Sequence, residues 1–111
     1  MLTTIAAGSY NARDFAPPAG TGYWGVSGLR RVPVEGTRLH GVRLGNVSAN
    51  RPADIAGLKE GDIVIEFNGR PVRTRRGLEN YIDMAAPGSV INVTVIRDGQ
   101  RLDIPVKMGR D

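Results

Sequence analysis

The apolar positions near the start of the patterned region predict two strands. Apolar residues at 24, 26, 29 and 32 favour a strand that begins inside the glycine-rich stretch 20–28. Val42, Leu44 and Val47 follow a strand-like spacing that shifts near Gly45, which is typical of a strand with a bulge. A turn-rich connector separates the two predicted strands.

Two helices are predicted, one short and one long. Pro52 suits the first position of the short helix because its missing N–H would be unpaired there, and Gly57 or Gly61 supplies a left-handed exit. Thr74 is a good N-cap for the longer helix. The longer helix carries a single apolar stripe, formed by Leu78, Tyr81, Ile82 and Ala85.

Residues 63–67 predict a strand between the two helices. Strict alternation gives it two faces, one with Ile63, Ile65 and Phe67 and the other with Val64 and Glu66. The strand ends at Asn68-Gly69, which is the strongest short turn signal in the chain.

Residues 90–108 predict a hairpin that turns at Asp98-Gly99, and Pro105 indicates either an edge position for its second strand or an end of its pairing. The order is therefore strand, strand, short helix, strand, helix, strand, strand. It predicts an α+β fold, a small, partly open β-barrel or sandwich of about five to six strands capped by two helices.

Length and composition bound the organisation of the chain. Its 111 residues fit one domain, which we place at 21–109, after an Ala-, Pro- and Gly-rich tail or linker at 1–20. The net charge is +4 and comes almost entirely from arginine, in no dense basic cluster, so a solvated surface is favoured over nucleic-acid binding. No apolar run approaches twenty residues, so this segment is not expected to insert into a membrane.

Catalytic chemistry has few candidates in this sequence. There is no cysteine, and His40 is the only histidine, so we expect no catalytic residues, no metal site and no cofactor. Gly20, Gly22 and Gly25 form a GxGxxG pattern, but a Pro-rich tail precedes it where a dinucleotide-binding site requires a strand.

Three motifs, in order, resemble the PDZ domains of bacterial proteases. "RPADIAGLKEGDIVIEFNGRPV" is similar to their short helix, strand and Asn-Gly turn, and "GLENYIDMAAPGSVINVTVIRDGQ" is similar to their groove helix and last hairpin. "GYWGV" stands where that family has its carboxylate-binding loop. Arg51 occupies the family's usual serine position, so the cap of the short helix is lost or comes from Asn50.

The resemblance implies a peptide-binding site between a loop-and-strand segment and the longer helix. Gly25 would leave room for a ligand carboxylate, Ile82 would line the terminal pocket, and Trp24 would form its floor or only pack the tail. Arg75 would select an acidic or polar ligand residue or remain solvated. The full implied site is Tyr23, Trp24, Gly25, Val26, Ser27, Gly28, Leu29, Arg75, Leu78, Tyr81 and Ile82, with the last three shared between groove and core.

The implied function is a non-catalytic module that binds C-terminal or exposed apolar peptide tails by β-strand addition. It would present substrates or regulate activity within a larger bacterial protease, and its partners would be peptide or protein C-termini and other domains of that protein. The resemblance also implies a periplasmic or cell-envelope location. A structural role, with the groove filled by a neighbouring domain or by the tail through Phe15, and an anion-binding arginine surface are the alternatives.

Overall fold

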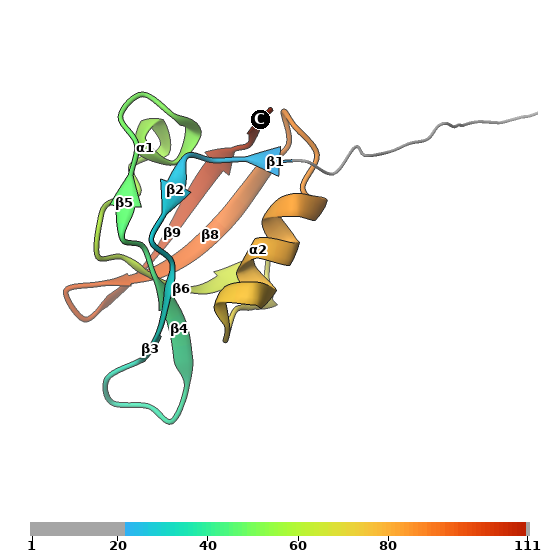
Figure 1. Ribbon diagram of the computed structural model, residues 1–111. Coiled ribbons are helices and arrows are strands. Elements are labelled where there is room, and N and C mark those ends of the chain that lie inside the picture. Colours follow the sequence, from blue (N-terminus) through green and yellow to red (C-terminus); the bar gives the residue numbers. More distant parts are fainter. Residues whose placement is uncertain (1–21, 111) are drawn as a thin grey trace, which may run out of the picture.

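The computed structural model describes residues 22–110 and contains one main antiparallel sheet (Figure 1). Its strands follow the order β3-β4-β6-β8-β9, with β7 paired to β6. The bounds are β3 (Arg30–Pro33), β4 (His40–Arg43), β6 (Ile63–Phe67), β7 (Arg70–Pro71), β8 (Val90–Arg97) and β9 (Gln100–Lys107). Of the two alternatives for Pro105, the edge position holds, because β9 ends the sheet.

Two short strand pairs stand beside this sheet, and the sequence pattern did not predict them as separate elements. They join β1 (Gly22–Tyr23) to β10 (Gly109–Arg110) and β2 (Val26–Ser27) to β5 (Asn46–Val47). The six-stranded main sheet and the two helices match the predicted α+β architecture. Glycines limit the β2–β5 pair, because Gly25 and Gly28 flank β2 and Gly45 precedes β5.

The helices begin and end close to the expected residues. In α1 (Pro52–Ala56), proline occupies the first turn and Gly57, with φ 103°, ends the helix. The Arg51 N-cap makes no side-chain capping bond, so the serine cap of the resembled family is absent. In α2 (Arg75–Met84), the Thr74 hydroxyl accepts a hydrogen bond from the Gly77 amide at 3.0 Å.

The predicted faces of β6 are wrong. Val64 is fully buried and Phe67 is 3% exposed, although strict alternation assigns them to opposite faces. The pairing of β6 with β8 shifts register between Val64 and Glu66, so one extra residue, Ile65, is accommodated in a β-bulge. The bulge returns both apolar side chains to the core.

An aromatic stack at the centre of the core joins the glycine-rich loop to α2. The Trp24 ring packs edge-on against Phe67, with ring centroids 6.0 Å apart, and Phe67 stacks on Tyr81 at the same distance. Leu78 and Ile82 of α2 are buried in the same core. Trp24 is thus a core side chain, although its neighbours in the chain are glycines.

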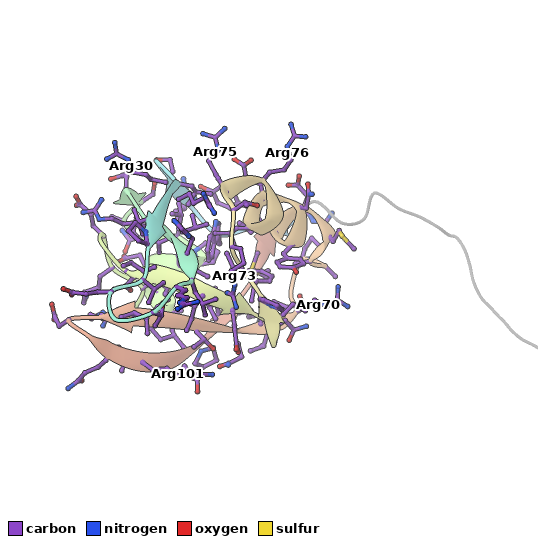
Figure 2. The ribbon with its side chains drawn as sticks, turned by 90° about the horizontal axis from the view of Figure 1, so that it is seen from below. Arg30, Arg70, Arg73, Arg75, Arg76 and Arg101 are labelled. Carbon is purple, nitrogen blue, oxygen red and sulfur yellow. The ribbon has the colours of Figure 1, made fainter. Side chains whose placement is uncertain are left out.

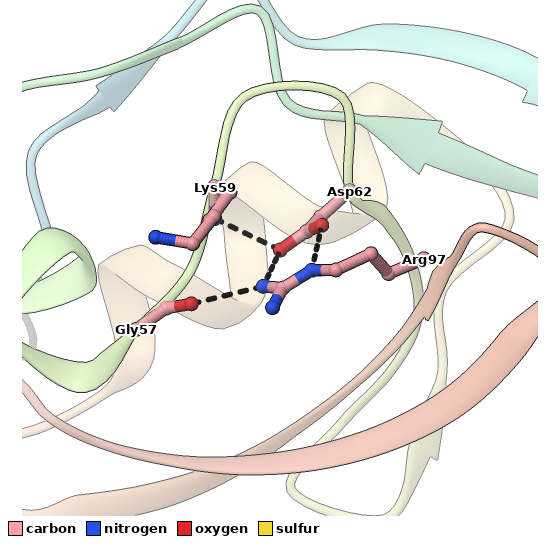
Figure 3. A network of polar contacts seen from close by, with 4 residues as sticks. All are labelled: Gly57, Lys59, Asp62 and Arg97. Atoms are coloured by element: carbon pink, nitrogen blue, oxygen red, sulfur yellow. Dashed lines mark hydrogen bonds and ion pairs between the residues drawn. The ribbon is translucent and has the colours of Figure 1, made fainter.

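An ion pair between Asp62, which is buried, and Arg97, which is 27% exposed, braces the turn after α1 (Figure 3). Asp62 is 2% exposed, and its two carboxylate oxygens accept from Nε and Nη2 of Arg97 at 2.8 and 2.6 Å. Arg97 also donates to the Gly57 carbonyl, and Asp62 closes the turn by accepting from the Lys59 amide. The hydrogen bond to Asp62 raises the pKa of Arg97 above its ordinary value.

Candidate functional site

A pocket of about 230 Å³ lies between the glycine-rich loop and α2. Figure 1 shows β1 and β2 leading past the side of this helix. The lining residues are Gly22, Tyr23, Trp24, Gly25, Val26, Leu29, Glu79, Ile82 and Asp83. The structure therefore brings together most of the loop residues predicted from the sequence, with Ile82 opposite them.

Close backbone packing fixes the closed end of this pocket. A Cβ on Gly22 would lie 2.6 Å from the carbonyl oxygens of Ile82 and Ala85, so only glycine allows β1 to approach the end of α2 this closely. Trp24, 3% exposed, forms part of the lining from beneath, and Ile82, 8% exposed, forms part of it from the helix. Trp24 and Ile82 thus give the pocket an apolar floor where β1 meets the end of α2.

Gly25 is required by two separate features. Its φ is +80°, a conformation that side chains other than hydrogen disfavour. A Cβ built on it would also overlap the Cβ of Arg51 and lie 2.9 Å from Arg51 Cγ. Glycine at this position therefore avoids a clash with Arg51, in addition to leaving the room for a ligand that the sequence suggested.

Two successive peptide groups of the loop are held in a fixed orientation. The Trp24 carbonyl accepts from the Ala53 amide, and the Gly25 carbonyl accepts from the Ser48 amide, each at 2.9 Å. No peptide bond among the described residues is cis, so the N–H of each of these peptide groups points opposite to its carbonyl. The N–H groups of Gly25 and Val26 therefore point away from α1 and β5, and two successive donors of this kind suit an anion.

The second edge of β2 faces α2. Within the described part of the chain β2 pairs only with β5, with Val26 opposite Val47 and Ser27 opposite Asn46. Because Ser48 donates to the Gly25 carbonyl, the alternation of an antiparallel ladder directs the N–H and C=O of Val26 away from β5. Val26 presents backbone groups to the groove, whereas those of Ser27 point to β5.

Gly28 ends this edge. Its φ is +69°, and a Cβ on it would lie 3.2 Å from the Cα of Gly45, so the two backbones touch where β2 and β5 separate. The shift near Gly45 that the sequence indicates corresponds to this contact.

The remaining predicted residues of α2 do not line the pocket. Leu78 is fully buried in the core. Tyr81 faces the other side of the helix, where its hydroxyl donates to the Pro71 carbonyl at 3.2 Å and its ring borders a second cavity of about 160 Å³. Arg75 is exposed, and its Nε lies 3.8 Å from a carboxylate oxygen of Glu79.

Sequence reasoning missed three residues of the lining: Gly22 as a wall, and the acidic Glu79 and Asp83. The helical period could have signalled the two carboxylates, since positions 79, 82 and 83 fall on one side of α2. The carboxylates make this wall of the pocket polar above an apolar floor.

Other site classes have little support among residues 22–110. That part of the chain holds no group of three His, Cys, Asp or Glu side chains able to bind a metal ion. His40 is half-buried at the start of β4, opposite Pro33. No helix in this part of the chain has the length and apolar character needed to cross a bilayer.

Comparison with known proteins defines the class of the domain. A PDZ-domain family model matches residues 24–108, so the chain belongs to the PDZ domain family. A PDZ domain is a non-catalytic module, which agrees with the sequence-based expectation.

The curated relatives are proteases. A probable periplasmic serine endoprotease, DegP-like, of Chlamydia trachomatis is 30% identical over 69 residues, which cover 62% of this chain and 14% of the relative. The serine endoprotease DegS of Salmonella typhimurium is 30% identical over 91 residues, covering 77% of this chain and 26% of the relative. The chain thus spans only a small part of the length of these relatives.

Solved structures share the fold. The HtrA-type protease AlgW with a decapeptide superposes with a TM-score of 0.71 at 23% identity, covering 80% of this chain and 29% of that one. The HtrA3 PDZ domain bound to a phage-derived ligand, FGRWV, has a TM-score of 0.63 at 21% identity, covering 79% of this chain and 88% of that one.

Proposed function

We propose that this domain captures the free C-terminal end of a peptide or protein as an added strand beside β2. The observation that carries the proposal is the fixed orientation of the Gly25 and Val26 N–H groups at the rim of a pocket floored by Trp24. Donors of this kind suit a terminal carboxylate, and the apolar floor of the pocket suits the last side chain. The main-chain groups of Val26 then pair with the ligand backbone.

We further propose that the domain, residues 21–109 with a preceding tail at 1–20, serves a larger bacterial protease. The curated relatives and the peptide-bound structures support a substrate-presenting or regulatory role. The relatives' names also support a periplasmic or cell-envelope location. The pairing of β1 with β10 supports extending the folded unit to residue 110.

The alternative in which the tail fills the groove through Phe15 falls outside the described residues. It remains a competing hypothesis that the same experiment addresses, because a chain lacking residues 1–20 would then bind added peptide more tightly than the full chain.

The test is a fluorescence titration that uses Trp24, the only tryptophan in the chain. Tryptophan-free peptides that end in Val, Leu, Phe or Ala are compared as free acids and as C-terminal amides. We expect the free acids to bind and the amides to bind at least tenfold more weakly, because the amide removes the charge that the Gly25 and Val26 N–H groups recognise. Equal binding of both forms, or no binding with and without residues 1–20, would refute the proposal.

Ile82→Ala tests the pocket itself. Its matched control is Ile55→Ala, which truncates an isoleucine that is 75% exposed on α1 and is not part of the lining. Ile82→Ala should weaken binding of the peptide ending in Leu more than that of the peptide ending in Ala, while the control leaves both unchanged. Circular dichroism confirms that each variant is folded.

A further inference from the structure

Arginines surround one end of the groove. They come from β3, from the residues before α2 and from the first turn of α2. This arginine rim consists of Arg30, Arg31, Arg73, Arg75 and Arg76. In Figure 2, Arg30, Arg75 and Arg76 project from the same side of the molecule, and Arg70 and Arg101 lie elsewhere.

Hydrogen bonds join the two sides of the rim. Nε of Arg31 donates to the Arg73 carbonyl at 3.1 Å, which ties β3 to the segment before α2. Nη1 of Arg73 donates in turn to the carbonyls of Ile65 and Val72 at 3.2 and 3.1 Å. The strand side and the helix side of the rim are therefore tied together through Arg31 and Arg73.

These contacts orient the groove. The C-terminal end of α2 touches Gly22 at the closed end, whereas the residues before its first turn touch Arg31. The helix therefore runs from the rim towards the pocket. A ligand with its carboxylate at Gly25 would run antiparallel to β2, so its upstream residues pass between Arg30 and the start of α2.

Few carboxylates neutralise the rim within the described residues. Arg75 makes a 3.8 Å ion pair with Glu79, and both side chains are at least half exposed, so the pair is weak. The ion pairs formed among residues 22–110 include none of the other four rim arginines. The first turn of α2 contains two arginines and no acidic residue, which the helix dipole disfavours, so a bound carboxylate would relieve this repulsion.

We propose that the arginine rim binds Asp and Glu side chains of the ligand that lie upstream of its groove-bound end. This inference rests on the proposed function. Arg76 and Arg75 lie one to two turns before Ile82 on α2, about 9–10 Å along the helix, and an extended ligand advances about 3.3 Å per residue, so they meet residues about three positions before the ligand's last residue. Arg30 and Arg31, on the strand side, meet residues about five to six positions before it. The rim continues the groove, so the peptide already held there supplies the anions, and charge complementarity selects an acidic segment.

The test compares two free-acid decapeptides with the full 111-residue chain. They share their last three residues, ending in Val, and differ only in having four Glu or four Gln immediately upstream. At about 20 mM salt the Glu peptide should bind about five- to twentyfold more tightly, and at about 0.5 M salt the ratio should fall below about twofold.

Two double variants of equal charge locate the effect. Arg30→Gln/Arg76→Gln should reduce the Glu-to-Gln affinity ratio at low salt to about twofold. The matched control, Arg70→Gln/Arg101→Gln, removes the same charge from exposed positions outside the rim and should retain most of the ratio. An equal loss of the affinity ratio in both double variants would show that only net charge acts and would overturn the proposal that the rim binds the acidic residues.

The remaining outcomes separate the two proposals. If both peptides bind the unmodified chain equally, the rim inference fails and the groove proposal stands. If neither binds, the groove proposal fails and the inference fails with it. If single-stranded DNA or vesicles of anionic lipid compete in a rim-dependent manner while the Glu peptide gains nothing, the rim serves that partner and the inference is overturned.

Discussion

Replacing Gly25 by alanine tests the central feature of the site. The Gly25→Ala variant should lose about 1–2 kcal/mol of folding free energy because an L-residue disfavours φ near +80°. The overlap of its Cβ with the side chain of Arg51 adds about 1–3 kcal/mol, typical of a group forced into a packed region. The free energy of unfolding should therefore fall by about 2–5 kcal/mol, and peptide binding should weaken because the Gly25 and Val26 N–H groups shift.

Gly36→Ala is the matched control. The φ of Gly36 is +81°, but no atom lies within 4 Å of the Cβ position. Gly36→Ala should therefore lower the free energy of unfolding only by the cost of the positive φ. Urea unfolding monitored by circular dichroism measures both variants, and the peptide titration measures binding. Adding Arg51→Gly to Gly25→Ala should recover stability, because it removes the overlapping side chain. Equal losses at positions 25 and 36, or no recovery with Arg51→Gly, would refute the reasoning.

Three further predictions concern charged groups. Arg97→Met leaves the Asp62 carboxylate buried without its partner and should lower the free energy of unfolding by about 3 kcal/mol in urea titrations. The Thr94 hydroxyl, 2.6 Å from Asp103, lowers the pKa of that carboxyl, so the stability it contributes is complete above pH 3.8 and is lost as the pH falls through the lowered pKa. Thr94→Val should make the acid loss of stability less steep, as measured by unfolding at stepped pH. Asp83→Asn removes a like charge beside the ligand carboxylate and should tighten peptide binding about two- to fivefold.

Each of these predictions has an outcome that contradicts it. Arg101→Met breaks an exposed 3.5 Å pair with Glu66 and should cost less than about 1 kcal/mol, so an equal loss in Arg97→Met would mean that the pair with Asp62 has no special weight. If the stability of Thr94→Val falls with decreasing pH as steeply as that of the unmodified chain, the hydrogen bond to Asp103 does not cause the acid loss of stability. Weaker binding by Asp83→Asn would indicate that this carboxylate contacts the ligand favourably.

Local signals account for the elements that sequence reasoning placed correctly. Proline at the first turn of α1, the Thr74 cap of α2 and the Asn68-Gly69 turn each act through neighbouring residues. Asn68 and Gly69 both have positive φ, as a tight hairpin turn requires. The sequence contains all the atoms of such interactions within a few positions, so their structures could be predicted.

The faces of β6 depended on a distant partner. Alternation within residues 63–67 gave no sign of a bulge at Ile65, because the bulge arises from the pairing of β6 with β8. The Arg97–Asp62 pair joins residues 35 positions apart and was likewise not visible in the sequence. Pairing register between strands is set by the packing of the whole sheet.

The sequence by itself determined which residues could build the site, and the tertiary structure decided which of them do. Helical spacing grouped Leu78, Tyr81 and Ile82 on one stripe, but that stripe is wide enough to meet the core, a second cavity and the groove at once. The packing of α2 against Phe67 on one side and Gly22 on the other turned Ile82, alone among these three apolar residues, to the pocket. Periodicity specifies a direction around one helix, whereas the neighbour met in that direction is fixed only when distant segments pack together.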